Sequence, residues 1–372
     1  MDFSFTEAQS AVAGLAKRIF EERLGPAALK ALEADPGRFD RNVWGELAQA
    51  GLLGTAIAEA HGGAGHGFLE LCALLEEAGA AVAPLPLWET LVLGAMTLQR
   101  HGNDAQRARF LPRVATGECV LTAALAEPDG DDPLHVRTTA RMSGGAWKLD
   151  GAKTCVPAAA LAERILVPAM TGATSLGMFL VDPRAAGVTL ERQIATTGDV
   201  QYHVGLAEAH VSNKDVVGDP SCGAAVLEWL VPRATVALCA MELGVVGRAL
   251  KTTATYTSSR QQFERPIATF QAVAQRAADA FIDVESIRVT TWQAAWRLAE
   301  GLPADDAVAI AKFFAAEAGH RVVYAAQHLH GGMGFDVEYP LYRYYLRSKQ
   351  IELTLGSGSV HLARLGARLA VE

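Results

Sequence analysis

A run of small and apolar residues before position 260 constrains the fold of this chain more than any other stretch. Its members include Ala234, Ala237, Ala240, Gly244, Gly247 and Leu250. Such a composition over one long segment predicts a helix that packs tightly against its neighbours. Arg260 lies near the end of this helix, and Pro266 enforces a break before the next one. The C-terminal part of the chain is therefore expected to be helical.

Four helical segments are predicted in this part, and together they would form a four-helix bundle. They lie near residues 224–259, 268–300, 304–330 and 340–371. Asp305 and Asp306 follow Pro303 and make a good helix start, because acidic side chains are favoured in the first turn. Gly331 and Gly332 end the third helix.

The N-terminal part, up to about residue 118, also has a helical pattern. Thr6 and Gln9 have the spacing of a capping box. The apolar residues that follow fall on one helical face: Val12, Leu15, Ala16, Ile19 and Phe20. Further helices are predicted from Trp44 onward, near residues 71–78 and near residues 91–98.

Between about residues 119 and 222 the pattern changes to short runs bounded by turn residues, which predict strands. Gly144 and Gly145 separate two of these runs and predict a hairpin. Other candidate strands lie near residues 164–168, 178–182, 187–191 and 202–211. Several short strands at regular spacing favour a small barrel or sandwich. We therefore expect an α+β chain with domains at residues 1–118, 119–222 and 223–372.

Composition limits the partners and the location of the protein. The 372 residues, half of them hydrophobic, suffice for two or three domains. A net charge of −8 without any basic run argues against nucleic acid and anionic membranes as partners. The five cysteines are scattered without metal-type spacing, which suits a reducing compartment. With an acidic N-terminus and no long uncharged apolar run, we expect a soluble, cytoplasmic protein.

Arg260 and the two glycines each have two interpretations. A guanidinium keeps its charge and can bind a diphosphate through paired hydrogen bonds, while Phe263 and Ile267 could cover a flat ring. Alternatively, Arg260 is a solvated cation that the helix dipole favours at a helix end. Gly331 and Gly332 could admit a phosphate close to backbone N–H groups, or could cap a helix.

Two motifs in these segments resemble signatures of the acyl-CoA dehydrogenase family of flavoproteins. The first comprises Tyr256, Arg260, Gln262, Phe263, Pro266, Ile267 and Gln271. The second, similar to a Gln-x-x-Gly-Gly-x-Gly segment of that family, is Gln327-His328-Leu329-His330-Gly331-Gly332-Met333-Gly334-Phe335. Their order and spacing match the family, and the likeness extends over nearly the whole chain. The resemblance implies an N-terminal helical domain, a middle β-barrel and a C-terminal four-helix bundle.

The resemblance also implies FAD as cofactor. In the family, the matching residues hold the adenosine and diphosphate half of an FAD that is bound mainly by the neighbouring subunit. The candidate cofactor-binding residues are therefore Arg260, Gln262, Phe263, Gln271, His328, Gly331 and Gly332. Position 328 is usually glutamine in the family, whereas here Gln327 precedes a histidine. No metal site is expected, because His328 and His330 lack a nearby Cys, Asp or Glu ligand pattern.

The half of the family's site that contacts the flavin ring is largely missing from this sequence. Members usually carry Thr-Glu-Pro-x-x-Gly-Ser, where this chain has Ala126-Glu127-Pro128-Asp129-Gly130-Asp131-Asp132. Members then have a Trp-Ile-Ser/Thr element, where this chain has Lys153-Thr154-Cys155-Val156-Pro157. The expected threonine, tryptophan and hydroxyl groups are therefore not at these positions.

The usual catalytic base is missing as well. In the family a carboxylate takes the α-proton of the thioester while a hydride leaves the β-carbon for the flavin. The usual glutamate position falls on Leu355, and a second position used by some members falls near Ala234. Glu242 is a candidate for a displaced base, because burial among apolar residues raises a carboxyl pKa, but a structural contact to a neighbouring helix is the preferred interpretation. Glu352 is expected at the surface, so no residue is assigned as catalytic.

These gains and losses predict a division of labour between two homologous chains. Residues that would serve a neighbour's cofactor are present, while those that would serve the chain's own flavin are absent. The segments 339–345 and 349–356 also resemble the non-catalytic subunits of bacterial heterotetrameric acyl-CoA dehydrogenases that degrade steroid side chains. The expected partners are a homologous catalytic subunit, an acyl-CoA with a bulky acyl group and an electron-transfer flavoprotein.

Two alternatives stay open at this point. One is a self-sufficient homotetrameric acyl-CoA dehydrogenase that uses Glu242 as its base. The other is a flavin-free scaffold that keeps the fold for assembly only. Oxidases and monooxygenases share the fold, and the sequence does not exclude them.

Overall fold

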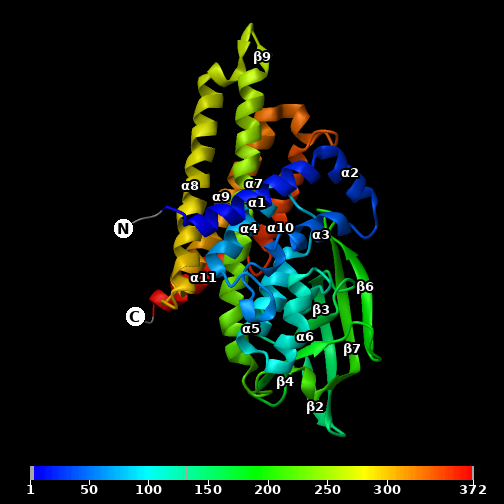
Figure 1. The fold of residues 1–372 in the computed structure, drawn as a ribbon. Helices are drawn as coiled ribbons and strands as arrows, with labels where there is room; N and C mark the ends of the chain where they lie inside the picture. The colour runs from blue at the N-terminus through cyan, green and yellow to red at the C-terminus, as the bar shows by residue number, and fades with distance from the viewer. Residues whose placement is uncertain (1–3, 129, 131, 371–372) are drawn as a thin grey trace. The chain divides into compact units, whose positions relative to one another are not determined.

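The structure is a computed structural model that describes residues 4–128, 130 and 132–370. Helices come first along the chain, then strands, then helices again (Figure 1). The chain divides into two compact units. One comprises residues up to Lys30, Cys72–Ala83 and residues from Thr235 onward, and the other comprises Ala31–Leu71 and Pro84–Ala234. The three predicted domain boundaries stay a prediction.

The first unit is helical. Its helices are α1 (Glu7–Arg23), most of α4 (Phe68–Ala80), most of α7 (Gly223–Ser259), α8 (Gln271–Ala299), α9 (Asp305–His330), α10 (Leu341–Leu353) and α11 (Gly358–Leu369). Helix α9 packs against α8, α10 and α11. The predicted C-terminal helical bundle is therefore confirmed.

Helix α7 packs as tightly as its small residues predict. A Cβ atom at Gly244 would lie 1.8 Å from the carbonyl oxygen of Glu76 on α4, and one at Gly79 would lie 2.0 Å from the carbonyl oxygen of Met241. Only glycine permits this approach of two backbones. Among the described helices, α7 alone is long and apolar enough to cross a membrane, and 83% of its most apolar 18-residue window is buried. Length and apolar composition do not distinguish a membrane-spanning helix from a buried core helix, and α7 is mostly buried.

The helix ends agree with the sequence. The Thr6 hydroxyl accepts a hydrogen bond from the Gln9 N–H at 3.2 Å, and the Gln9 side chain accepts one from the Thr6 N–H at 3.0 Å. This capping box starts α1, whose predicted inner face is largely buried at Val12, Ala16, Ile19 and Phe20. Helix α9 begins at Asp305, and Gly331 caps its C-terminus.

The prediction of a single helix over residues 340–371 is wrong. Helix α10 ends at Leu353 and α11 starts at Gly358. Between them, Leu355 and Gly356 adopt positive φ angles of 60° and 99°, which a continuous right-handed helix excludes. The Nζ of fully buried Lys312 donates to the carbonyl oxygens of Ile351 and Glu352, so it satisfies the last turn of α10 from the side.

The second unit contains a β-sheet and several helices. Its helices are the last four residues of α2 (Pro26–Ala34), α3 (Arg41–Gln49), α5 (Thr97–His101) and α6 (Asp104–Ala115). The helix expected near residues 91–98 is found, but it starts as a π-helix over Trp88–Met96. Its strands are β1 (Leu121–Ala123), β2 (Thr139–Ser143), β3 (Ala146–Pro157), β4 (Arg164–Met170), β5 (Leu176–Val181), β6 (Val188–Ile194), β7 (Val200–Ser212) and β8 (Val216–Val217).

The strands confirm the expected β-rich middle region and form one mixed sheet. The strand order is β6-β7-β3-β2-β4-β5-β8, and β1 pairs with β4 in parallel. Gly144 and Gly145, with φ angles of 61° and 79°, connect β2 to β3 as predicted. Positive φ at both turn residues matches the right-handed twist of a two-residue hairpin, which explains the glycines.

Candidate functional site

The hairpin that carries Arg260 (residues 260–266, the Arg260 hairpin) projects beyond the ends of α7 and α8 (Figure 1). It is formed by β9 (Gln261–Gln262) and β10 (Arg265–Pro266). The Arg260 N–H donates to the Tyr256 carbonyl at 2.8 Å, and the Arg260 carbonyl accepts from the Ile267 N–H at 2.8 Å. The backbone of Arg260 is thus fixed, while its side chain is exposed and has no ion pair among the described residues.

The other side chains predicted on this hairpin are also exposed. Gln262 points into solvent, and 86% of the surface of Phe263 is accessible. Gln271, the first residue of α8, is exposed as well. Phe263 contacts only Phe270 among the aromatic rings of the described chain, edge-on at 6.2 Å. These side chains are therefore free to contact a ligand or a second polypeptide.

The second predicted segment is a single turn of 3₁₀ helix at Gly331–Phe335 (the glycine turn), which follows α9 directly. The N–H of Gly331 donates to the His328 carbonyl, so this glycine, at φ 59°, caps the helix. A Cβ atom at Gly332 would meet no atom within 4 Å, so the backbone here is open to an approaching group. A Cβ at Gly331 would likewise meet no atom within 4 Å, so both glycines leave the backbone open and Gly331 in addition caps the helix.

The structure separates the two candidates for the family's glutamine. His328 is exposed on the last turn of α9, whereas Gln327 is buried. The Oε1 atom of Gln327 has no hydrogen-bond partner and lies 2.3 Å from where a Cβ of Gly334 would be. Because of this burial, Gln327 cannot replace the surface glutamine that the family motif places at position 328.

Three aromatic rings (Tyr256, His330 and Tyr339, the aromatic cluster) connect the Arg260 hairpin to the glycine turn. Tyr256, four residues before Arg260, stacks on His330 with ring centroids 4.3 Å apart and planes at 20°. His330 immediately precedes Gly331 and lies 5.2 Å from the ring of Tyr339. The structure thereby brings together the two motifs that the sequence places about 70 residues apart.

Sequence reasoning missed the contribution of His330 and Tyr339 to this arrangement. Neither lies at a position that the family motif singles out, and no periodic pattern relates residue 256 to residue 330. The usable signal was local: Tyr256 is one helical turn before Arg260, and His330 is next to Gly331. Only the packing of α7 against α9 shows that these neighbours touch.

In the sheet, the segment that differs from the family pattern contains a buried ion pair. The Oε1 of Glu127 accepts from Lys153 Nζ at 2.6 Å and from the Thr138 hydroxyl at 2.7 Å. Burial lowers the pKa of Lys153 to about 8 even beside this carboxylate. The pKa of Glu127 is lowered overall. Burial alone would raise it, but the hydrogen bonds from Lys153 and Thr138 outweigh the effect of burial.

The two described positions that the family fills with a threonine and a tryptophan carry Ala126 and Cys155, which have no hydroxyl or indole. Ala126 contributes only its backbone, because its carbonyl accepts from the Thr154 N–H at 3.0 Å. Cys155 is exposed at φ 51°, and its N–H donates to the Gln193 side chain at 3.0 Å. Asp129 and Asp131 of the predicted acidic segment lie outside the described residues. Nothing in the described part of this segment provides the family's contacts to a flavin ring.

The position of the usual base is a backbone turn. The carbonyl of Leu355 accepts a hydrogen bond from His361 Nε2 at 3.0 Å, and its side chain carries no proton acceptor. Ala234, the second position, is buried. Glu352 is not the surface residue that was expected: its side chain is only 18% exposed and pairs with Lys349 at 2.6 Å.

Glu242 makes the structural contact that was preferred for it. It is 0% exposed, and its Oε1 accepts from the Ser348 hydroxyl on α10 at 2.6 Å. Its other oxygen is buried without a partner, and its side chain fills the space beside Gly319 on α9. Burial raises its pKa to about 8, although Ser348 and the charge of Lys312 oppose this shift. Helices α7, α9 and α10 therefore enclose this carboxyl group, which is not exposed to a ligand from solvent.

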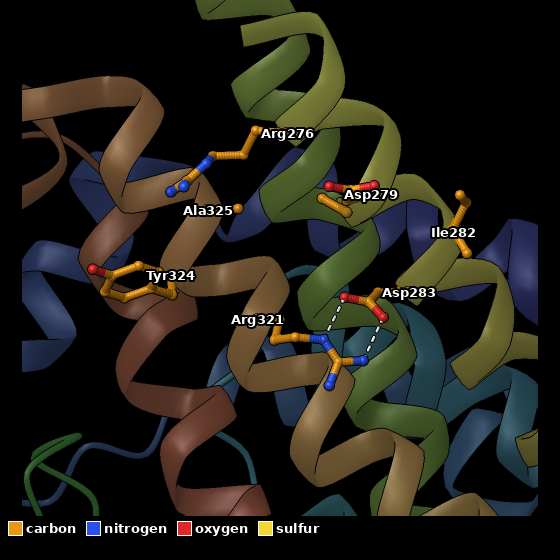
Figure 2. A pocket seen from close by; sticks show the side chains of 8 residues that line it. Arg276, Asp279, Ile282, Asp283, Arg321, Tyr324 and Ala325 are labelled. Atoms are coloured by element: carbon orange, nitrogen blue, oxygen red, sulfur yellow. Dashed lines mark hydrogen bonds and ion pairs between the residues drawn. The ribbon is translucent and has the colours of Figure 1, made fainter. Parts of the chain in front are cut away.

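A pocket of about 460 Å³ lies between α8 and α9 (Figure 2). Arg321 on α9 binds both carboxylate oxygens of Asp283 on α8, with the Nε···Oδ2 distance at 2.9 Å. Arg276 and Tyr324 line the same pocket from opposite helices. None of the seven predicted cofactor-binding residues lines it, so it is separate from the candidate site.

Comparison with known proteins agrees with these observations. Residues 6–118 match the model of the acyl-CoA dehydrogenase N-terminal domain, and residues 223–370 match that of the C-terminal domain. The chain is 39% identical to acyl-CoA dehydrogenase FadE27 of Mycobacterium tuberculosis, covering 100% of this chain and 99% of the relative.

Two solved structures are similar over nearly the full length. A variant of the Tcur3481-Tcur3483 steroid ACAD is 43% identical, with a TM-score of 0.91 and 98% of each chain covered. The ChsE4-ChsE5 complex from Mycobacterium tuberculosis is 39% identical, with a TM-score of 0.94, over 100% of this chain and 99% of the other.

More distant structures share the fold and bear on the cofactor. A chain from the structure of the electron transferring flavoprotein of Acidaminococcus fermentans is 25% identical over 99% of both chains, with a TM-score of 0.92. The FAD complex of PigA, at 22% identity and a TM-score of 0.91, shares the fold. FAD is the cofactor of the acyl-CoA dehydrogenase family that the family models identify. With the helical bundle, the β-sheet and both motifs in place, this protein belongs to the acyl-CoA dehydrogenase family of flavoprotein oxidoreductases.

Proposed function

We propose that this chain is the non-catalytic subunit of a heteromeric acyl-CoA dehydrogenase. It supplies the adenosine and diphosphate side of an FAD whose flavin ring and catalytic glutamate belong to a homologous partner subunit. The substrate class is acyl-CoA thioesters with bulky acyl groups, including steroid side chains, and the electrons pass to an electron-transfer flavoprotein. The compartment is the cytoplasm.

The observation that carries this proposal is the contrast between the two halves of the site. Arg260, Gln262 and Phe263 are exposed, and Gly332 leaves open space beside its backbone. An exposed guanidinium and an open glycine fit the diphosphate of FAD, which needs donors and close backbone approach. These groups face away from the protein's own core, as they must if a second chain brings the cofactor.

The ring-binding half of the site lacks the residues that would bind an isoalloxazine or accept the substrate proton. The positions that would contact the ring carry Ala126 and Cys155, and the position of the base carries Leu355. Bound FAD accepts the hydride in this family's reaction. The residues of this chain contribute binding and orientation of the cofactor, and the proton is taken by a carboxylate of the partner.

The similar proteins support the heteromer and the substrate class. The ChsE4-ChsE5 structure is a complex of two different chains, and the Tcur3481-Tcur3483 protein is a steroid ACAD that also has two named components. The chain from the electron transferring flavoprotein structure supports the electron acceptor. A homomeric enzyme with Glu242 as base gains no support, because that side chain is fully buried within the helical unit.

Arg260→Ala tests the proposal in the complex. The protein is co-expressed with a homologous acyl-CoA dehydrogenase chain that retains the family's glutamate, and the FAD content per heteromer is measured from the visible spectrum. Loss of charge-assisted hydrogen bonds, worth about 1.5–3 kcal/mol each, should lower FAD affinity by about tenfold or more. Arg18→Ala, an exposed arginine on α1, is the control and should retain wild-type FAD content.

Unchanged FAD content in the Arg260→Ala complex would contradict the proposal and favour the flavin-free scaffold. Stoichiometric FAD and acyl-CoA turnover by the chain purified alone would instead establish the homomeric enzyme. In that case the Glu242→Gln variant of the isolated chain should lose its turnover.

A further inference from the structure

The Arg260 hairpin and the glycine turn end different helices, so something must fix them relative to each other if both are to bind one diphosphate. Arg260 follows α7 and Gly332 follows α9. Both segments are exposed, and no hydrogen bond joins them directly among the described residues. The aromatic cluster is the contact between the two helix ends.

His330 is the central member of that cluster. Its ring is 3% exposed, and Tyr256 covers one face at a centroid distance of 4.3 Å. The ring of Tyr339 lies 5.2 Å from that of His330, with the two planes tilted by 49°. Tyr256 and Tyr339 are farther from each other, at 6.4 Å. Histidine thus contacts both tyrosines more closely than they contact each other.

Two hydrogen bonds fix the orientation of the ring. Nδ1 lies 2.8 Å from the Ala326 carbonyl, which can only accept, so this nitrogen carries the proton. Nε2 is then the acceptor for the Tyr339 hydroxyl at 3.2 Å. One bond ties the ring to α9, and the other ties it to the segment that follows the glycine turn. A leucine or phenylalanine at this position could fill the space but could make neither bond.

The backbone transmits this orientation to the candidate ligand groups. The Tyr256 carbonyl accepts from the Arg260 N–H at 2.8 Å, so the stacked tyrosine and the arginine share one hydrogen-bonded turn. On the other side, His330 is the last residue of α9 and is bonded covalently to Gly331. Tyr256, which stacks on the ring, is thus one helical turn from Arg260, and His330 itself is two residues from Gly332.

From this geometry we infer that His330 is a positioning residue for the cofactor diphosphate. It holds the Arg260 hairpin and the glycine turn in register, so that the guanidinium of Arg260 and the backbone at Gly332 bind the same ligand. It does not touch the cofactor, because its ring is buried. The inference rests on the proposed function, since it assigns a role within the same site.

The test is a double-mutant cycle on the heteromeric complex, with FAD binding to deflavinated protein as the readout. His330→Leu keeps apolar bulk and removes both hydrogen bonds, and it should weaken FAD binding by about tenfold. Arg260→Ala should weaken binding by about tenfold in the wild-type background but only about twofold in the His330→Leu background, because the arginine is already misplaced. Native mass spectrometry verifies that the heteromer is intact in each variant.

Two further variants keep the test decisive. Tyr339→Phe removes a single hydroxyl with minimal risk to folding, and it should weaken FAD binding by about threefold. His361→Leu removes another buried, hydrogen-bonded histidine of the same helical unit, and it should leave FAD affinity unchanged. If His330→Leu does not fold, the Tyr339→Phe and Arg260→Ala cycle decides.

The outcomes separate the two proposals. If Arg260→Ala itself leaves FAD binding unchanged, both the proposed function and this inference are overturned. If Arg260→Ala weakens binding but its effect is the same in both His330 backgrounds, only the inference is overturned. The inference is also overturned if His330→Leu lowers the unfolding temperature without altering FAD affinity, because His330 would then contribute only to packing.

Discussion

At the scale of single residues, burial decides what an ionisable group does in this protein. Glu242 and Glu127 are both buried carboxylic acids, yet their pKa values move in opposite directions. Glu127 meets the ammonium of Lys153 at 2.6 Å and remains ionised. Glu242 accepts a hydrogen bond from Ser348 but has no ion pair at bonding distance among the described residues, so burial dominates although the charge of Lys312 opposes it. The first is half of an ion pair and the second is a neutral acid at physiological pH.

Glu242→Gln should flatten the pH dependence of stability. The folded protein retains a proton on Glu242 up to about pH 8, whereas the unfolded chain loses it near its ordinary value of 4.5. The folded state therefore binds more protons in this window, and the free energy of unfolding falls as pH rises from about 5 to about 8. A neutral glutamine lacks this contribution, so the variant should gain relative to wild type as pH increases.

Thermal unfolding of both proteins across this pH range provides the measurement. The difference between their unfolding temperatures should be pH-dependent and should change in favour of the variant toward alkaline pH. Parallel curves for the two proteins would show that Glu242 does not titrate in this window.

The sequence identifies single residues better than the contacts between them. Arg260, Gly331 and Gly332 were placed at helix ends from breaker and cap signals alone, and the structure agrees. The stacking of Tyr256 on His330 was not predictable, because it depends on the crossing of two helices about 70 residues apart. Whether the seven predicted residues bind FAD stays a prediction.

At the scale of elements, two short turns show which helix ends could be predicted from the sequence and which could not. The glycine turn was visible because two consecutive glycines interrupt a helical pattern. The turn between α10 and α11 was missed although Gly356, Ser357 and Gly358 interrupt the helical pattern, because Leu355 and the residues after Gly358 fit a helix. Lys312 stabilises that turn from α9, and such a distant cation leaves no local signal.

Gly332→Ala should separate the structural role of the glycine turn from its role in binding. A methyl group at this position meets no atom within 4 Å, so the free energy of unfolding should change by about 0.5 kcal/mol or less. The same methyl group would occupy the space through which a diphosphate approaches the backbone, so FAD affinity of the complex should fall by about tenfold.

Gly331→Ala is the informative contrast, because φ at Gly331 is 59°. That substitution should destabilise the protein by about 1 kcal/mol through backbone strain. Calorimetry and FAD titration of both variants distinguish the two effects. Equal FAD affinity in Gly332→Ala and wild type would show that no phosphate approaches this turn.

At the scale of the whole molecule, the fold is that of the acyl-CoA dehydrogenase family, although several residues usual in the family are missing. Local patterns were enough to predict the helical and β-rich regions, because hydrophobic periodicity changes clearly near residues 119 and 223. The order of strands in the sheet was not predictable, since β1 and β4 pair in parallel across about 40 residues. Function cannot be taken from such a fold alone, because the site residues decide it.

Leu355→Glu should therefore fail to produce a dehydrogenase from this chain alone. The substitution restores a carboxylate at the family's usual position, but the segments at Ala126 and Cys155 still lack contacts for a flavin ring. The variant purified without a partner should contain no stoichiometric FAD and should not reduce an artificial electron acceptor with an acyl-CoA. Turnover by this single variant would show that the chain binds a flavin on its own and lacked only its base.

Two phenylalanine rings, those of Phe263 and Phe335, are largely exposed to solvent in the single chain. Phe263 is 86% exposed and Phe335 is 75% exposed. Under the proposed function, a partner subunit covers these rings, and a newly made copy without that partner should expose them to chaperones and proteases. We expect its abundance to follow the supply of that counterpart, so that ending synthesis of one chain shortens the lifetime of the other.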